Sequence, residues 1–322
     1  MKFIAAFAVL AIGATAVAAA GERVGTLSLV RSVNQKTKLW TASLSSPVAR
    51  MSLEEVRAQL LGVTDAGKFH AGFARVQHTA AARAAAPAAY DPRTEYPNCT
   101  SMRMIRDQAW CGSCWAFGAV SAISDRICMR EGRDVILSSQ DMLACSGAGG
   151  CNGGMPYSAY RYWVSTGVVT EACAPYSFAS CDHHIPGSTN PCPSGYGPTP
   201  ACERTCKNGQ DWESDKHRGR KAYAVAGEAD MMAELSSRGP CEAVIAVYED
   251  FLVYTSGVYH HVSGRLAGYH AIKILGYGEE NGTKYWLLAN SWNEHWGEKG
   301  YFRMLRGSDE CGVESDLTCG EL

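Results

Sequence analysis

Beyond its first 21 residues, the 322-residue chain has no apolar run of the ~20 residues that a membrane-spanning helix needs. Charged residues are few, at 19%, the net charge is −2, and no stripe of Lys and Arg follows residue 84. These absences exclude a nucleic-acid partner and a later membrane span as working hypotheses. The 46% of hydrophobic residues is typical of a folded globular protein.

Residues 21–79 contain no cysteine, whereas all fourteen cysteines lie beyond the alanine-rich segment 79–89. So many cysteines predict a disulfide-forming compartment. The charge divides at nearly the same place, with nine Lys or Arg against four Asp or Glu in 22–83 and twenty against twenty-eight from residue 84. We therefore expect a basic leader that is held partly by charge on an acidic, cross-linked body.

The first residues predict a secretory signal peptide over 1–20, because a positive start, an apolar run and three alanines follow one another. An amino-terminal membrane anchor is the alternative. Ser52 and Glu55 form a capping-box pattern that predicts a helix over 52–61. The segment 79–89 is typical of a linker that a protease can cut. The expected division is a signal peptide, a leader over 21–85 and a body over 86–322.

The most informative stretch is Cys111-Gly112-Ser113-Cys114-Trp115. The apolar period that follows predicts a buried helix over 113–129, so Cys114 lies at a helix start, where the helix dipole favours a thiolate. From the residues alone, three interpretations stay open. Cys111 and Cys114 are a redox pair, half of a zinc site, or one structural cysteine beside one nucleophile.

The amino-acid sequences of three segments resemble those of the papain and cathepsin cysteine proteases. The segments are 111–115, 269–278 with His270, and 285–293 with Asn290. The resemblance extends to the cathepsin B-like subgroup through segments 105–108, 119–128, 151–154, 181–192 and 256–259. It implies an α+β, two-lobed papain-like fold, with a helical lobe, an antiparallel barrel-like β lobe and the active site in the cleft between them.

The resemblance assigns the attacking thiolate to Cys114, its acid–base partner to His270 and the orientation of that imidazole to Asn290. Trp292 is expected to shield the His270–Asn290 bond from water. Gln108 is expected to donate to the oxyanion together with the backbone of Cys114. No metal and no cofactor are expected.

The segment 181–192 resembles the occluding loop of cathepsin B-like proteases. In it, His183 and His184 are expected to bind the free carboxylate of a substrate, which implies removal of C-terminal dipeptides beside endopeptidase activity. The resemblance pairs Asp107 with His183 as a clamp. A second clamp is expected to be absent, because Thr189 and His295 stand where the subgroup often has arginine and aspartate, so the loop should be easily displaced.

Further residues are placed by the resemblance. The substrate-binding residues are expected to be Gly153, Gly154, Met155, Pro156, Val244, Ala271, Trp292 and Asp316. The implied disulfides join Cys99 to Cys128, Cys111 to Cys151, Cys145 to Cys202, Cys173 to Cys206 and Cys181 to Cys192. Cys241, Cys311 and Cys319 are left over, so at least one free thiol or intermolecular pair is expected. Four further histidines are expected to be surface or structural: His217, His260, His261 and His295.

The sequence thus predicts a cysteine protease made as a zymogen, which acts on protein and peptide substrates in a lysosome-like acidic vesicle or outside the cell. Its own leader, and inhibitors of the cystatin type, are the expected protein partners of a monomer. Two alternatives remain: a secreted, non-catalytic binding protein on the same fold, and a thiol oxidoreductase that uses Cys111 and Cys114.

Overall fold

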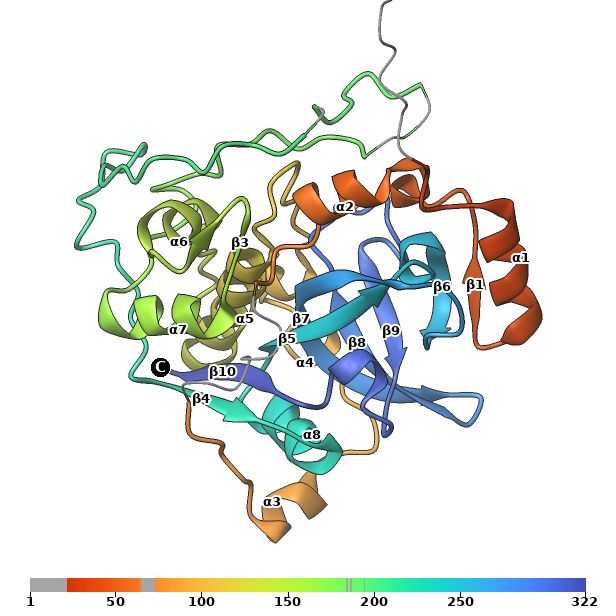
Figure 1. The fold of residues 1–322 in the computed structure, drawn as a ribbon. Helices are drawn as coiled ribbons and strands as arrows, with labels where there is room; N and C mark the ends of the chain where they lie inside the picture. The colour runs from red at the N-terminus through yellow and green to blue at the C-terminus, as the bar shows by residue number, and fades with distance from the viewer. Residues whose placement is uncertain (1–21, 65–72, 184, 186, 194) are drawn as a thin grey trace, which may run out of the picture.

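The computed structural model describes residues 22–64, 73–183, 185, 187–193 and 195–322. A lobe of helices lies beside a lobe built on a large sheet (Figure 1), and the predicted mixed α+β architecture is confirmed. Within these residues, no helix is both long and apolar enough to cross a membrane. The expected signal peptide at 1–20 lies outside the described residues.

The leader, meaning residues 22–85, forms short elements that lie on the body. They are α1 (Leu27–Lys36), β1 (Trp40–Ala42), a 3₁₀ helix (Pro47–Arg50), α2 (Leu53–Gln59) and α3 (Ala80–Ala85). The predicted capping box is confirmed at α2, where the Glu55 carboxylate accepts from the Ser52 N–H at 2.7 Å. The alanine-rich segment is not a plain linker, because Thr79 caps α3 inside it.

The body contains five helices and nine strands among the described residues. The helices are α4 (Pro92–Glu95), α5 (Cys114–Glu131), α6 (Ser139–Cys145), α7 (Pro156–Ser165) and α8 (Glu228–Ser237). The strands are β2 (Gly149–Gly150), β3 (Gly153–Gly154), β4 (Lys221–Val225), β5 (Cys241–Tyr248), β6 (Tyr254–Tyr259), β7 (Leu266–Glu280), β8 (Thr283–Ala289), β9 (Tyr301–Leu305) and β10 (Leu317–Glu321). Short 3₁₀ turns occur at Thr100–Arg103, Phe251–Val253 and Glu310–Gly312.

The large sheet has the strand order β1-β6-β9-β8-β7-β5-β10-β4. Its pairs are antiparallel except β6 with β9, which is parallel. The predicted antiparallel lobe is confirmed, with this one parallel pair as an addition to it. The leader supplies the edge strand β1, so that it closes the edge that β6 would otherwise leave open.

Helix α5 is the central element of the helical lobe and carries Cys114 at its start. Ser113 precedes it, and Gly132 ends it with a φ of 66°, a left-handed conformation that glycine adopts without strain. The helix is buried on nearly every side, which is why its sequence is apolar or small almost throughout. Its Asp125 pairs with Lys273 of β7 at 2.7 Å, and this buried ion pair joins the two lobes next to the cleft.

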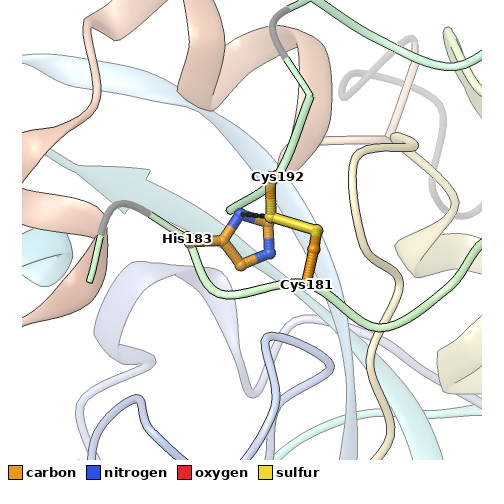
Figure 2. A group of neighbouring side chains, drawn as sticks. All are labelled: Cys181, His183 and Cys192. Atoms are coloured by element: carbon orange, nitrogen blue, oxygen red, sulfur yellow. Dashed lines mark hydrogen bonds between the residues drawn. A yellow bond between two sulfur atoms is a disulfide. The ribbon is translucent and has the colours of Figure 1, made fainter. Parts of the chain in front are cut away.

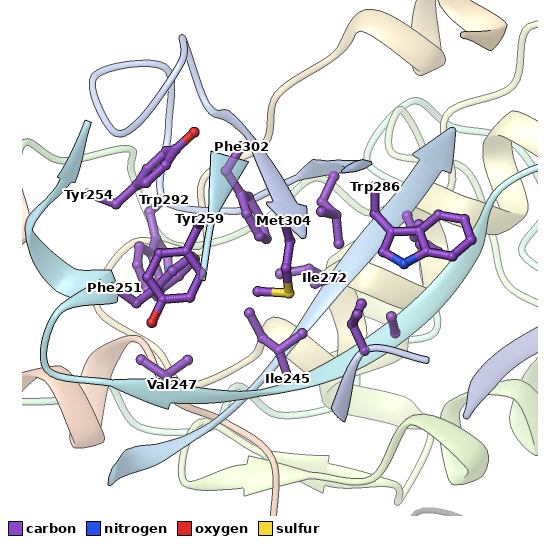
Figure 3. Close-up of a cluster of buried hydrophobic side chains, with 14 of the residues drawn as sticks. Ile245, Val247, Phe251, Tyr254, Tyr259, Ile272, Trp286, Trp292, Phe302 and Met304 are labelled. Atoms are coloured by element: carbon purple, nitrogen blue, oxygen red, sulfur yellow. The ribbon is translucent and has the colours of Figure 1, made fainter. Parts of the chain in front are cut away.

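The β lobe is filled by aromatic and branched side chains that face one another between its strands (Figure 3). Trp292, which follows β8, packs edge-on against Trp296, with ring centroids 5.1 Å apart. Trp292 therefore packs in the core of the β lobe and also contacts the His270 ring of the cleft. This packing fixes the strand end from which Asn290 projects.

Candidate active site

Cys114 lies at the amino end of α5 and is completely buried. Its Sγ accepts the backbone N–H of Ala271 at 3.4 Å, which brings the start of α5 against β7. Cys111 is bonded to Cys151, so the two cysteines of the Cys-x-x-Cys stretch have different states. Cys114 keeps a free thiol, and exchange of a disulfide between Cys111 and Cys114 has no basis in this arrangement.

His270, next to Ala271 on β7, directs its Nε2 at Asn290 Oδ1 over 2.7 Å. The indole of Trp292 lies over this contact, with its ring centroid 4.7 Å from that of His270. Both His270 and Trp292 are buried. A buried imidazole held by an amide oxygen has its Nε2 protonated, which leaves Nδ1 as the nitrogen that exchanges protons.

Gln108 is fully buried, and its side chain is held in one orientation. Its Oε1 accepts the hydroxyl of Ser291 at 2.7 Å, and its Nε2 donates to the carbonyl of Cys111 at 3.0 Å. The same Nε2 donates to two leader carbonyls, of Gln59 at 2.9 Å and Leu60 at 3.2 Å. The leader therefore occupies the donor that an oxyanion would need.

The leader crosses the cleft directly over Cys114. The Gly62 carbonyl accepts from the Gly154 N–H at 2.9 Å, and the Thr64 N–H donates to the Gly154 carbonyl at 3.2 Å. A Cβ on Gly62 would lie 2.0 Å from the carbonyl oxygen of Gly112 and 3.1 Å from Cys114 Sγ. Only glycine allows the leader backbone to approach this closely.

Cover by the leader determines the charge of the pair. Burial raises the pKa of the Cys114 thiol to about 12, although backbone N–H groups of Ala271, Gly62 and Trp115 act against that rise. Burial lowers the pKa of His270 to about 4, although its bond to Asn290 acts in the opposite direction. The thiolate expected at the helix start is therefore absent from the covered site, which holds a neutral thiol and a neutral imidazole.

Comparison with known proteins shows the family to which this arrangement belongs. Residues 86–320 match the profile of the papain family cysteine proteases. The chain belongs to that family. Cathepsin B-like cysteine proteinase 6 of Caenorhabditis elegans is 42% identical over 91% of this chain and 82% of its own length, and the cathepsin B-like cysteine proteinase of Schistosoma japonicum is 47% identical over 73% and 72%.

Among solved structures, procathepsin B S9 from Trypanosoma congolense is similar to this chain with a TM-score of 0.82 and 34% identity, over 93% of this chain and 99% of the other. The predicted recognition as a cathepsin B-like cysteine protease is confirmed, and so is the expectation of a zymogen form. In the protease described here, as in that proenzyme, the leader lies on the protease body.

The segment 181–192, which resembles an occluding loop and keeps that name below, is closed by the Cys181–Cys192 disulfide. His183 is buried against that disulfide, with its Nδ1 3.3 Å from Cys192 Sγ (Figure 2). Its Nε2 lies 4.0 Å from Asp107 Oδ1, the partner that the resemblance implies. His184 lies outside the described residues.

A second clamp holds the loop, so the expectation that it is absent is wrong. His295 Nε2 on the body lies 3.6 Å from Asp182 Oδ1 on the loop. The acidic residue lies on the loop and its basic partner, a histidine, lies on the body. This is the reverse of the subgroup's arrangement, in which the basic residue stands at the position of Thr189 on the loop. The loop residue of this pair is Asp182, directly before His183, and not Thr189.

The two walls of the expected specificity pocket come from different lobes. Val244 of β5 and Ala271 of β7 are paired in register and buried in one cluster. On the other wall, a Cβ on Gly154 would lie 2.5 Å from the Trp115 ring, so glycine allows the backbone of β3 to pack directly on that ring. Met155 and Pro156 follow it at the start of α7, and Asp316 precedes β10 and is half-buried.

Six disulfides cross-link the described residues. Five are the pairs that the resemblance implies, and the sixth joins Cys241 to Cys319. Cys311 is left as a free, half-buried thiol. Three groups of Cys with His, Asp or Glu lie close enough to hold a metal, but each contains two sulfurs joined in a disulfide, which offer no thiolate.

Two residues that contact the leader or Gln108 were not found from the sequence. His260 Nε2 lies 2.8 Å from the Thr37 hydroxyl of the leader, so this histidine is more than a surface residue. Ser291 orients Gln108. Neither residue stands in a spacing that predicts its contact, because each contact joins segments more than 180 positions apart.

Proposed function

We propose that the protease cleaves peptide bonds through Cys114 and His270. Once the leader is removed, the thiolate attacks the peptide carbonyl carbon, and the carbon–nitrogen bond breaks as His270 protonates the leaving amine. Water then hydrolyses the thioester and returns a proton to His270. The observation that carries this proposal is the free thiol of Cys114 at a helix start, adjoining the strand that holds His270 on Asn290.

Two further groups support the reaction. The buried amide of Gln108 donates to the oxyanion after the carbonyls of Gln59 and Leu60 have left it. Asn290 keeps the imidazole oriented without neutralising it, because an amide oxygen accepts the Nε2 proton but carries no charge. Removal of such an oxyanion donor costs about 100- to 1,000-fold in kcat in comparable sites.

The test is labelling of the processed protein with an epoxysuccinyl peptide, a reagent for activated thiols. The parent and a Cys311→Ser variant should each take up one label, whereas Cys114→Ser, with its leader cut off by an added protease, should take up none. The Cys311 variant is the matched control, since Cys311 is the second free thiol among the described residues. Loss of the label in Cys311→Ser instead would assign the reactive thiol elsewhere and overturn the proposal.

The occluding loop supports C-terminal dipeptidase activity beside endopeptidase activity. His183 is fixed by its place against Cys192 and near Asp107, while His184 is assigned by resemblance alone. A loop held at both Asp107 and Asp182 favours substrates that end at the loop. Internally quenched peptides with a free carboxyl end should therefore be cut faster than the same peptides with an amidated end, and equal rates would contradict the proposal.

The leader over 21–85 is proposed as the inhibitor of the zymogen, removed by a cut near residue 86. Glycine at position 62 and the carbonyls on Gln108 support this role. The six disulfides fit the secretory pathway, with a lysosome-like vesicle or the extracellular space as the destination. Arginine in the substrate should be tolerated near Asp316, with hydrophobic side chains preferred.

A further inference from the structure

Near its carboxyl end, the leader meets the body again at the far edge of the sheet. Residues 74–76 lie along β4, where the Val76 N–H donates to the Ala224 carbonyl at 2.8 Å and the Ala224 N–H donates to the Ala74 carbonyl at 3.2 Å. β4 is the edge strand opposite β1. The leader thus pairs with both edges of the sheet, and α3 lies beside α8 at the bottom of Figure 1.

His78 enters the body at this place. Its side chain is 5% exposed, and its Nε2 lies 2.8 Å from Oε2 of Glu234 on α8. Its backbone N–H donates to Asp230 Oδ1 at 2.7 Å, and Arg83 of α3 lies 3.4 Å from the same carboxylate. A histidine and an arginine of the leader therefore meet two acidic side chains of one helix.

Glu234 is a fixed acceptor. Its Oε1 accepts from Arg126 Nη2 at 2.7 Å and from the Tyr223 hydroxyl at 2.6 Å, so Oε2 is the oxygen turned to the leader. Burial alone would raise the pKa of this carboxyl, but the charge of Arg126 and bonds from His78 and Tyr223 lower it to about 2. The carboxylate stays charged in mild acid, so acidification to pH 5 does not remove the acceptor.

We propose that the β4–α8 surface, meaning the Ala224 edge with Asp230 and Glu234, is a second docking site for the leader, separate from the catalytic cleft. Its ligand is the leader segment 74–83. In this segment Val76 pairs with the edge strand, His78 follows two residues later and Arg83 five residues after that. Its release is a separate step that frees segment 79–89, whose side chains are already exposed or half-buried, from the helical conformation of α3, so that a protease can bind it in an extended form. This regulatory role rests on the proposed inhibition by the leader, whereas the docking itself does not.

The docking is tested by hydrogen exchange on the full chain carrying Cys114→Ala, which cannot process itself. His78→Ala should speed exchange of the Val76 and His78-position amides by about 10- to 100-fold, the loss expected for a charge-assisted hydrogen bond. The Thr64 amide, bonded over the cleft, should keep its protection. His78→Gln, whose amide can donate to Glu234, should restore part of the protection.

Lys38→Ala is the matched control, because Lys38 is an exposed leader cation whose ammonium donates to the Asn34 carbonyl of the leader itself. It should leave exchange at residues 74–78 unchanged. Unchanged exchange in His78→Ala, or equal loss of protection at Thr64, would overturn the idea of a separate site. Because Cys114 is replaced, neither result depends on the proposed catalytic roles.

The regulatory step is tested on the full chain with Cys114 intact. His78→Ala should shorten the half-time of leader removal at pH 5 by at least about threefold, while Lys38→Ala should not. Faster exchange with an unchanged half-time would keep the docking site and refute its control of cleavage. The labelling experiment with the epoxysuccinyl peptide separately tests the proposed catalytic thiol.

Discussion

At the scale of single residues, the Cys114–His270 pair of the covered cleft differs from the proposed working pair in where one proton resides. The covered pair is a neutral Cys114 thiol and a neutral His270, whereas the proposed uncovered pair is a thiolate and an imidazolium. Each state holds one proton between the two groups. The change from the neutral pair to the charged pair therefore takes up no proton from solution near neutral pH. If acid loosens the leader, it must do so by protonating other groups.

Gly62→Ala tests how the leader protects the thiol. Its new Cβ would lie 2.0 Å from the Gly112 carbonyl oxygen, so the leader backbone must move away from Cys114. In the full chain, we expect alkylation of Cys114 by iodoacetamide to become at least about tenfold faster, because the thiol is both uncovered and more easily ionised. The rate is measured by mass spectrometry of the Cys114 peptide.

Gly25→Ala is the control for that change. Its Cβ would lie 2.5 Å from the Ala49 Cβ, so it strains the leader near α1 without touching the cleft. Alkylation of Cys114 should stay slow. Equal acceleration in both variants would mean that any strain in the leader uncovers the thiol, and the close approach at Gly62 would have no special role.

Ser291→Ala tests a positioning residue. The Ser291 hydroxyl holds Gln108 Oε1 at 2.7 Å and so directs the amide hydrogens at the oxyanion. Loss of this bond should lower kcat by about five- to tenfold, as expected for about 1 kcal/mol, with little change in KM. In a Gln108→Ala background, the same change should have almost no effect. A fall in kcat that persists there would assign Ser291 a structural role instead.

At the scale of elements, the occluding loop is held by contacts of unequal strength. The Asp182 N–H donates to the Asn190 carbonyl at 2.8 Å, and Asp107 accepts from the Cys181 N–H at 3.3 Å. The Asp182–His295 pair is more exposed, with 62% of the His295 side chain open to solvent. Exposed pairs contribute about 0–1 kcal/mol, so this clamp adjusts the loop and does not fix it.

His295→Ala and Asp182→Asn should each lower the ratio of dipeptidase to endopeptidase rate by about two- to fourfold at pH 5, because each removes the same weak clamp. The ratio is measured with matched peptides that end in a free or an amidated carboxyl. The double variant should show no more loss than either single variant. Additive losses would mean that the two side chains act on the loop independently.

Segments near Cys114 were predictable because their chemistry is local. The helix over 113–129 follows from its apolar period, and the capping box at Ser52 follows from the spacing of two residues. The helix α3 was missed because an alanine-rich stretch with Pro87 fits a linker equally well, and the Thr79 cap decides between them. The contacts of His78 and Asp182 were not predictable, because tertiary packing alone brings their partners from 156 and 113 positions away.

At the scale of the whole molecule, the buried network around Glu234 joins three parts of the chain. Arg126 of α5 bonds the Pro240 carbonyl before β5, the Gly320 carbonyl of β10 and the carboxylate of α8. His78 brings the leader to the same carboxylate. Leader and both lobes therefore share one charged centre, whose stability depends on Glu234 staying ionised.

That dependence predicts the response of the full chain to strong acid. The pKa of Glu234 is lowered from 4.5 to about 2, so the carboxylate stabilises the fold fully above pH 4.5 and loses this contribution as the pH falls toward 2. The loss amounts to about 3 kcal/mol by linkage. We expect the free energy of urea unfolding of the Cys114→Ala chain to fall between pH 4.5 and 2.5 by more than that of the same chain with Glu234→Gln. The glutamine variant is less stable at pH 6 but lacks this titrating group, so parallel pH profiles for the two chains would contradict the lowered pKa of Glu234.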